Sequence, residues 1–168
     1  GGAERVVQSD LSRKFLNVAK ISYTLNGFPI NKIDFQIGDF WPHINHLKRA
    51  SERFDCVFLD PPFFASTSKG RIDLAENSAR LINKVRPLIE DGGHLVAINN
   101  ALFQSGADFF RTLEKLCEDG YLKIASLIPA PEDFTGYAET RVGTPPVDPA
   151  PFNHSTKIAI LKVRRKSI

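Results

Sequence analysis

Most of the information about this fold lies in the stretch Cys56-Val57-Phe58-Leu59-Asp60-Pro61-Pro62-Phe63. Its first four residues form a continuous apolar run, which is typical of a strand covered by helices on both faces and favours the centre of a parallel sheet. The run ends at an acidic residue before two prolines, so the chain is expected to turn there. Because ligands bind beyond the carboxyl ends of parallel strands, the stretch predicts a ligand site at Asp60 to Phe63.

Strands and helices alternate on both sides of this stretch. Apolar runs predict strands at residues 4–10, 33–37, 56–59, 94–98, 122–128 and 157–163. Helical periodicity predicts helices at residues 13–26, 42–50, 74–85 and 105–118. Such alternation is typical of βαβ units, so we expect an α/β fold with a doubly wound, mostly parallel sheet.

The composition is typical of one globular domain with a sizeable core, because 42% of the 168 residues are hydrophobic and 24% are charged. No window approaches the roughly 18 consecutive apolar residues that span a bilayer, and the first residues lack the order of a signal peptide. We therefore expect a cytoplasmic protein without a membrane partner. Cys56 and Cys117 have neither disulfide density nor metal-ligand spacing, and we expect packed thiols.

The basic residues give a weak signal for an anionic partner. The net charge is +3, and basic residues gather at 69–71, at Arg80, Lys84 and Arg86, and at 162–166. A solvated helix face and a frayed tail explain each cluster alone at least as well as RNA does.

A Pro-rich segment, residues 129–154, contains six of the eleven prolines and shows no regular period. Long connections of this kind in a compact domain are usually functional or mobile loops. We interpret it as a semi-rigid wall over a substrate, the alternative being a surface excursion without a role.

Three expected strands end in an acidic residue, at Asp10, Asp39 and Asp60. A carboxylate at such an end can accept both hydrogen bonds of a ribose diol, a role that suits Asp10. Aspartate is also common in turns and caps after strands, and for any single site that interpretation is the better one. Three such positions at one sheet edge favour a ligand site.

The motifs Ser9-Asp10-Leu11-Ser12, Gly38-Asp39-Phe40, Asp60-Pro61-Pro62-Phe63 and Gly92-Gly93 together resemble those of class I S-adenosylmethionine-dependent methyltransferases. The chain is most similar to bacterial large-subunit ribosomal RNA methyltransferases, from Gly1 to about Asn100. The resemblance implies a Rossmann-like catalytic domain over residues 1–168, S-adenosyl-L-methionine as cofactor, ribosomal RNA as partner and no metal.

The resemblance also implies roles for individual residues. Asp10, with Leu11, would bind the cofactor ribose, and Gly38, Asp39 and Phe40 would frame its adenine. Asp60, Pro61, Pro62 and Phe63 would hold the target base beside the methyl group, with Phe63 stacked on the base. Lys69 and Lys157 are further candidates for contacts with the substrate.

Asn99 and Asn100 separate this chain from the carbon-methylating members of the family, which carry a nucleophilic cysteine just after the corresponding strand. We therefore expect methylation of a ring or exocyclic nitrogen rather than of carbon 5 of cytosine. The two amides are interpreted either as readers of base edges or as residues that end a strand, with equal weight.

The residues before Asp10 depart from the family pattern. A Gly-rich loop is expected roughly 20 residues before this acid, and only nine residues precede it. We expect an N-terminally truncated sheet, without the first strand and Gly-rich loop, and half of a cofactor pocket. That strand would lie between those ending at Asp10 and Asp60.

Other functions remain open at this stage. A non-enzymatic α/β domain that binds RNA or protein is the main alternative. A nicotinamide-dependent dehydrogenase would also use Asp10, but in such an enzyme residues 60–63 would have no role. The segment Asp60 to Phe63 is also compatible with DNA or a protein glutamine as the methyl acceptor. His43 and His46 are interpreted as an exposed helix face rather than a zinc site. No oligomeric state is favoured.

Overall fold

The computed structural model describes residues 2–67, 70–101, 104–128 and 156–165. The elements follow one another as β1 (Gln8–Asp10), α1 (Arg13–Leu25), β2 (Phe35–Ile37), α2 (Phe40–Arg49), β3 (Phe54–Leu59), β4 (Phe64–Thr67), β5 (Gly70–Asp73), α3 (Leu74–Val85), β6 (Ile89–Asn99), α4 (Gly106–Cys117), β7 (Leu122–Ile128) and β8 (Lys157–Val163). Short 3-10 helices at Lys32–Asp34 and Arg86–Leu88 precede β2 and β6.

The strands form one four-stranded sheet and two pairs. The four-stranded sheet has the order β3-β6-β8-β7, while β1 pairs with β2 and β4 with β5. β3 is parallel to β6, and β8 is antiparallel to both β6 and β7. The expected α/β fold is confirmed, with β8 as the strand that runs against its neighbours.

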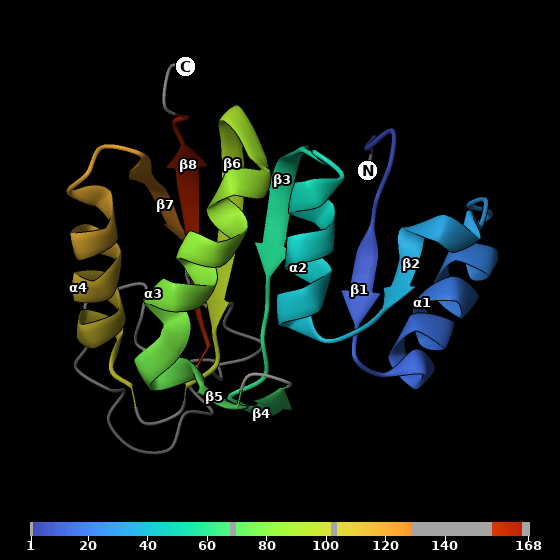
Figure 1. Cartoon of the computed structure of the whole chain (residues 1–168), viewed down its shortest axis with the longest axis horizontal. Coiled ribbons are helices and arrows are strands. Elements are labelled where there is room, and N and C mark those ends of the chain that lie inside the picture. Colours follow the sequence, from blue (N-terminus) through green and yellow to red (C-terminus); the bar gives the residue numbers. More distant parts are fainter. Residues whose placement is uncertain (1, 68–69, 102–103, 129–155, 166–168) are drawn as a thin grey trace, which may run out of the picture.

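The hydrophobic core lies between the four-stranded sheet and helices α2, α3 and α4, which cover one face of it in Figure 1. Helical spacing turns Leu81, Ile82 and Val85 of α3 inward, each 1% exposed. Phe109 of α4 fills the space beside them. In β6 the same face holds Leu95 and Ala97, and the intervening residues are only half-buried.

β3 is an edge strand of its sheet in the described part of the chain; its apolar run favoured a central position, whereas the expected absence of a strand between those ending at Asp10 and Asp60 agrees with an edge. Only β6 pairs with it. Phe58 is 72% exposed, and Cys56 is exposed instead of packed. An apolar run favours a strand, but it does not determine which elements cover its two faces.

Several local expectations need correction. The first strand covers only Gln8–Asp10, and Lys32–Asp34 forms a 3-10 helix instead of extended backbone. Helix α2 begins at Phe40, two residues before the expected Pro42, because the Asp39 side chain accepts a hydrogen bond from the Trp41 backbone N–H and caps the helix. The segment after Phe63 forms the β4–β5 hairpin, for which the sequence predicts no element.

The Gly92-Gly93 pair lies inside β6, which begins at Ile89 rather than at His94. Gly92 has a φ of +78°, which favours glycine. A Cβ on Gly93 would lie 2.7 Å from the Asp55 carbonyl oxygen of β3. Glycine at 93 therefore permits the close approach of β6 to β3, where their register shifts.

The β1–β2 pair makes no ladder with the four-stranded sheet in the described chain. Arg5 links the two units, since its Nε donates to Asp34 at 2.8 Å and its Nη1 to Glu52 at 3.2 Å. In Figure 1 the arrows of β1 and β3 point the same way, which puts their carboxyl ends at the same end of the molecule. Within the described residues, no helix is both long and apolar enough to cross a membrane.

Candidate functional site

Asp60 and Asn100 meet where two neighbouring parallel strands end. β3 and β6 pair in a register that sets Leu59 opposite Ala97, so the residues after each strand emerge side by side. The Asn100 Nδ2 donates a hydrogen bond to the Asp60 Oδ1 at 2.8 Å. This contact orients one carboxylate oxygen of Asp60. The carboxylate is exposed and can accept further hydrogen bonds, since each of its oxygens has two lone pairs.

Thr156 joins this pair from the start of β8. Its Oγ1 donates to the Asn100 Oδ1 at 2.9 Å. The amide oxygen of Asn100 is thereby directed to Thr156 and the NH2 group to Asp60. Sequence reasoning missed Thr156, because it lies 56 residues after Asn100 and no local pattern distinguishes it from other threonines.

Asn99 points into the protein and is 1% exposed. Its Nδ2 donates to Gln104 at 2.8 Å, and its Oδ1 accepts from the Ala101 backbone N–H at 2.9 Å. Of the two interpretations of the asparagine pair, Asn99 therefore fits the structural one. Asn100 is the one that faces the site.

Lys157 is also buried, with 1% of its surface exposed. Its Nζ donates to the Ala101 carbonyl oxygen at 3.0 Å. Together with the side chain of Asn99, its partner in the β6–β8 register, it shapes the turn that follows β6. The structure thus does not bring Lys157 to the surface beside Asp60.

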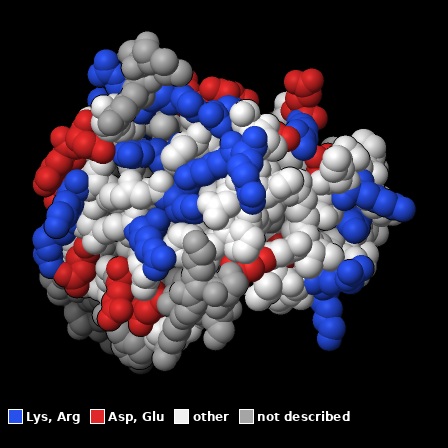
Figure 2. Space-filling model, viewed as in Figure 1, with Lys and Arg blue, Asp and Glu red and all other residues white. Residues whose placement is uncertain are grey.

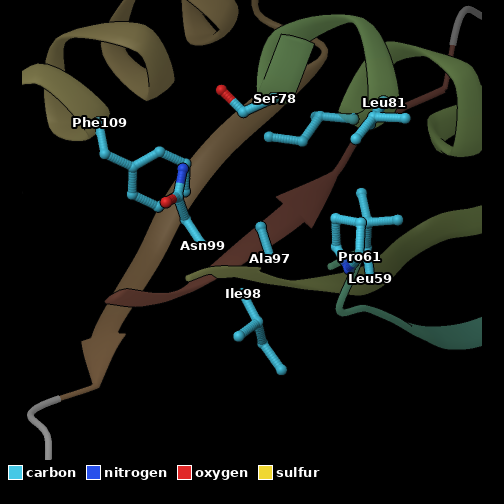
Figure 3. A pocket seen from close by; sticks show the side chains of 9 residues that line it. Leu59, Pro61, Ser78, Leu81, Ala97, Ile98, Asn99 and Phe109 are labelled. Atoms are coloured by element: carbon cyan, nitrogen blue, oxygen red, sulfur yellow. The ribbon is translucent and has the colours of Figure 1, made fainter. Parts of the chain in front are cut away.

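Pro61 and Phe63 anchor the Asp60–Phe63 segment on the core. Pro61 borders a pocket whose lining also includes Leu59, Ser78, Leu81, Ile82, Ala97, Ile98, Asn99 and Phe109 (Figure 3). Phe63 packs against the core, and its ring centroid lies 4.0 Å from that of Phe64, which is 45% exposed. Pro62 is exposed. An aromatic pair therefore follows Asp60 within four residues, although the sequence indicated only Phe63.

Asp10 ends β1 as predicted and is half-buried. Its Oδ1 accepts from the Ser12 backbone N–H at 2.6 Å, and its carbonyl oxygen accepts from the Gly38 N–H at 3.1 Å. Asp10 and Gly38 are thus neighbours at the carboxyl ends of β1 and β2. Beside them, Leu11 is 65% and Ile37 is 48% exposed, which gives an apolar surface around a carboxylate.

Asp39 and Phe40 connect β2 to α2. The Asp39 Oδ1 caps α2 through Trp41, with an N···O distance of 3.0 Å, so the cap interpretation of this acid is realised. Phe40 is half-buried, packs against the core and meets Trp41 in an edge-on contact of 5.0 Å between ring centroids. Both residues come directly after Gly38 in the chain, next to its contact with Asp10.

Two predicted features lie outside the described residues, namely Lys69 and the whole of the Pro-rich segment 129–154. The pKa of each cysteine thiol is raised above its ordinary value, which lowers its thiolate fraction at neutral pH. Partial burial, and then the Asp55 carboxylate, raise the pKa of Cys56, and burial likewise raises the pKa of Cys117. Among the residues described, no cluster of three or more His, Cys, Asp or Glu side chains is arranged to hold a metal ion.

Comparison with known sequences identifies a family. Residues 1–141 match the model of the S-adenosylmethionine-dependent methyltransferase family. The chain is 35% identical over 103 residues to "Ribosomal RNA large subunit methyltransferase K/L" of Psychrobacter arcticus, covering 59% of this chain and 13% of the relative. It is 36% identical over 99 residues to "Ribosomal RNA large subunit methyltransferase I" of Vibrio cholerae, covering 57% and 25%.

Solved structures share the fold. The structure described as "SMU.776, a putative methyltransferase complexed with SAH" superposes with a TM-score of 0.78 at 21% identity, over 97% of this chain and 40% of that one. A methyltransferase from Agrobacterium tumefaciens superposes with a TM-score of 0.61 at 16% identity, over 98% and 50%. The chain thus spans half or less of each relative's length.

The match over residues 1–141 confirms the family that the motifs at Asp10, Asp39 and Asp60 predict, and with it S-adenosylmethionine as the family's cofactor. This chain belongs to the S-adenosylmethionine-dependent methyltransferases.

Proposed function

We propose that the protein transfers a methyl group from S-adenosylmethionine to a ring or exocyclic nitrogen of a nucleobase in large-subunit ribosomal RNA. The observation that carries this proposal is the Asn100–Asp60 hydrogen bond of 2.8 Å beside an aromatic pair, at the strand ends of a family member. The names of the relatives from Psychrobacter arcticus and Vibrio cholerae support the choice of ribosomal RNA.

The residues at the ends of β1 and β2 fit the nucleoside part of the cofactor. Asp10 is held by its contact with Ser12 and is flanked by the exposed apolar side chains of Leu11 and Ile37. Its carboxylate would accept hydrogen bonds from the ribose hydroxyls. Gly38, Asp39 and Phe40 would border the adenine. When bound, the cofactor supplies an electrophilic methyl group on a sulfonium.

The Asp60–Phe63 segment would hold the target base. The Asp60 carboxylate accepts one hydrogen bond from Asn100 and retains lone pairs for an exocyclic amine. An exposed aromatic ring beside it, that of Phe64, offers a stacking surface together with Phe63. A base removed from its helix would thus be fixed by its edge and by its face.

Alignment is the main task of these side chains, because the donor is already activated. The lone pair of the target nitrogen would form the new N–C bond to the methyl group that the cofactor supplies, with the sulfonium sulfur as leaving group, and an exocyclic amine would then pass its proton to Asp60 or to water. Carbon 5 of cytosine would need a thiolate to add to the ring first. Cys56 lies within β3, four residues before Asp60, Cys117 ends α4, and the pKa of each thiol is raised.

The test is incubation of the protein, expressed from its complete natural coding sequence, with methyl-labelled S-adenosylmethionine and separate pools of unmodified ribosomal RNA, DNA and protein. We expect label in the RNA pool and recovery of an N-methylated nucleoside after digestion. Label confined to DNA or protein, or found on carbon 5 of cytosine, would overturn the proposal.

Asp60→Ala should remove this transfer while the affinity for S-adenosylmethionine, measured by calorimetry, stays unchanged. Asp55→Ala is the matched control, because Asp55 is exposed on the same strand at its opposite end. The control should retain full turnover. Turnover retained by Asp60→Ala would show that this carboxylate does not place the base.

A further inference from the structure

Two cationic side chains of α3 lie over one aromatic ring of α2, and a third cation of α2 lies near them. The Arg80 guanidinium of α3 lies 4.4 Å from the centroid of the Trp41 ring, and the Lys84 Nζ lies 6.0 Å from the same centroid. Trp41 belongs to α2 and is 4% exposed, so the cations lie over a buried indole. Lys48 of α2 is the third cation, and it lies one turn after Asn45, the α2 residue that accepts a hydrogen bond from Lys84. We call Lys48, Arg80 and Lys84 the α2–α3 basic surface.

The sequence does not indicate this arrangement, because Lys48 and Lys84 are 36 positions apart and belong to different predicted helices. The structure brings them together by packing α2 beside α3. Lys84 is held in place by the Asn45 Oδ1, which accepts a hydrogen bond from its Nζ. Desolvation by burial, and then the charge of Lys84, lower the pKa of Lys48.

Within the described part of the chain, none of these three cations forms an ion pair with a carboxylate. Other cationic side chains do have such partners, since Arg5 pairs with Asp34 and Glu52, and Arg86 pairs with Asp119. In Figure 2, Lys and Arg side chains gather over α2 and α3, and the Asp and Glu side chains lie mainly around the edges of this view. Converging cations without a carboxylate favour a bound polyanion.

We propose that Lys48, Arg80 and Lys84 bind the phosphodiester backbone of the RNA whose base enters the site at Asp60. This inference rests on the proposed function and adds the course of the RNA across the protein. A planar guanidinium suits a bidentate contact with a phosphate, and two ammonium groups add point charges beside it.

The geometry of α3 supports this course. The helix begins at Leu74, directly after the hairpin that follows the Asp60–Phe63 segment. With a rise of about 1.5 Å per residue, Arg80 lies roughly 9 Å and Lys84 roughly 15 Å along the helix from its start. The basic surface is therefore near enough to contact phosphates flanking the target nucleotide, and far enough to take no part in methyl transfer.

The test replaces all three cations with glutamine in the protein made from its complete coding sequence, as Lys48→Gln, Arg80→Gln and Lys84→Gln. Glutamine removes the charge and retains much of the side-chain stem that covers Trp41. The matched control is Lys14→Gln, Lys115→Gln and Lys123→Gln, three exposed lysines of α1, α4 and β7 with the same change in net charge. The probe is labelled oligouridylate RNA, titrated over a series of salt concentrations.

We expect the triple variant to bind this RNA at least tenfold more weakly at low salt, with a salt slope smaller by about 2, because about 0.7 counterions are released per phosphate contact in a single strand. Its KM for ribosomal RNA should rise, while kcat and the affinity for S-adenosylmethionine stay unchanged. The control should match the wild type.

Each possible outcome separates the surface from the reaction. If the wild type methylates RNA but the triple variant keeps the wild-type affinity and salt slope, the surface proposal is wrong and the proposed function stands. Polyglutamate serves as a second probe. If the triple variant loses binding to polyglutamate but keeps its RNA binding, the surface binds an acidic protein and the proposal is refuted. If the wild type methylates no RNA at all, the proposed function itself fails.

Discussion

The Asn100 side chain donates a hydrogen bond to the Asp60 carboxylate at 2.8 Å across the ends of two parallel strands, although the residues are 40 positions apart. This contact makes the end of the sheet a single unit, because Thr156 holds the other end of the same amide. The direction of the Asp60 carboxylate therefore depends on residues from β6 and β8.

Asn100→Ala should lower kcat for methyl transfer by about 10- to 100-fold, the range expected when a hydrogen bond to a charged group is lost. The affinity for S-adenosylmethionine should not change, because Asn100 lies at β6 and not beside Asp10. Single-turnover assays and calorimetry measure the two effects. Asn83→Ala, an exposed asparagine of α3, is the control. Equal rates for both variants would contradict the role of Asn100.

Thr156→Val should lower kcat by about 3- to 10-fold, since valine has a similar shape but cannot donate to the Asn100 oxygen. Thr156→Ser should restore the wild-type rate, because the serine hydroxyl retains the donor. In NMR spectra, the Asn100 side-chain NH2 should exchange faster with solvent in the valine variant than in the serine variant. Equal kcat values for the serine and valine variants would show that the Thr156 hydroxyl does not position Asn100.

Cys56→Ser combined with Cys117→Ser should leave methyl transfer unchanged within about twofold. The thiolate is the reactive form, and a raised pKa lowers the thiolate fraction at every pH below it. Alkylation of the exposed Cys56 by iodoacetamide should accordingly be slow at neutral pH and accelerate only in alkaline solution. A large loss of activity in the double variant would indicate thiol chemistry.

Gly93→Ala should destabilise the fold by about 1–3 kcal/mol, the usual range for forcing extra volume into packed structure. The new Cβ would lie 2.7 Å from the Asp55 carbonyl oxygen and 2.8 Å from the Ile89 side chain. Gly38→Ala is the control, because no atom lies within 4 Å of its added Cβ. Urea unfolding measures the stability of the two variants. Equal unfolding midpoints would show that β3 shifts enough to accommodate the methyl group at little cost.

Much of the fold follows from local patterns. The expected helix at 13–26 is α1, and the expected helix at 105–118 is α4, which the Ser105 side chain caps. The strands at 122–128 and 157–163 were predicted with their observed bounds. These elements depend on side-chain periodicity and capping groups within a few residues, so the sequence alone contains the needed information.

The pairing of strands, and the elements that cover each strand, do not follow from local patterns. The apolar run at 56–59 predicted the strand β3 but by itself favoured a central position, and the β4–β5 hairpin was missed. Which strands become neighbours depends on contacts between distant segments, and a local pattern describes only one partner of each contact. The antiparallel direction of β8 is another result of this kind.

The sequence by itself determined the family and the acids at three strand ends, because each motif is contiguous and its chemistry depends on adjacent residues. Only the tertiary structure decided that Asn100, and not Asn99, faces Asp60, that Lys157 is buried, and that Lys84 of α3 contacts Asn45 of α2. These relationships join residues that are distant in the chain, and they arise from strand register and helix packing. The physical reason is that side-chain direction and burial are properties of the assembled layers rather than of any single segment.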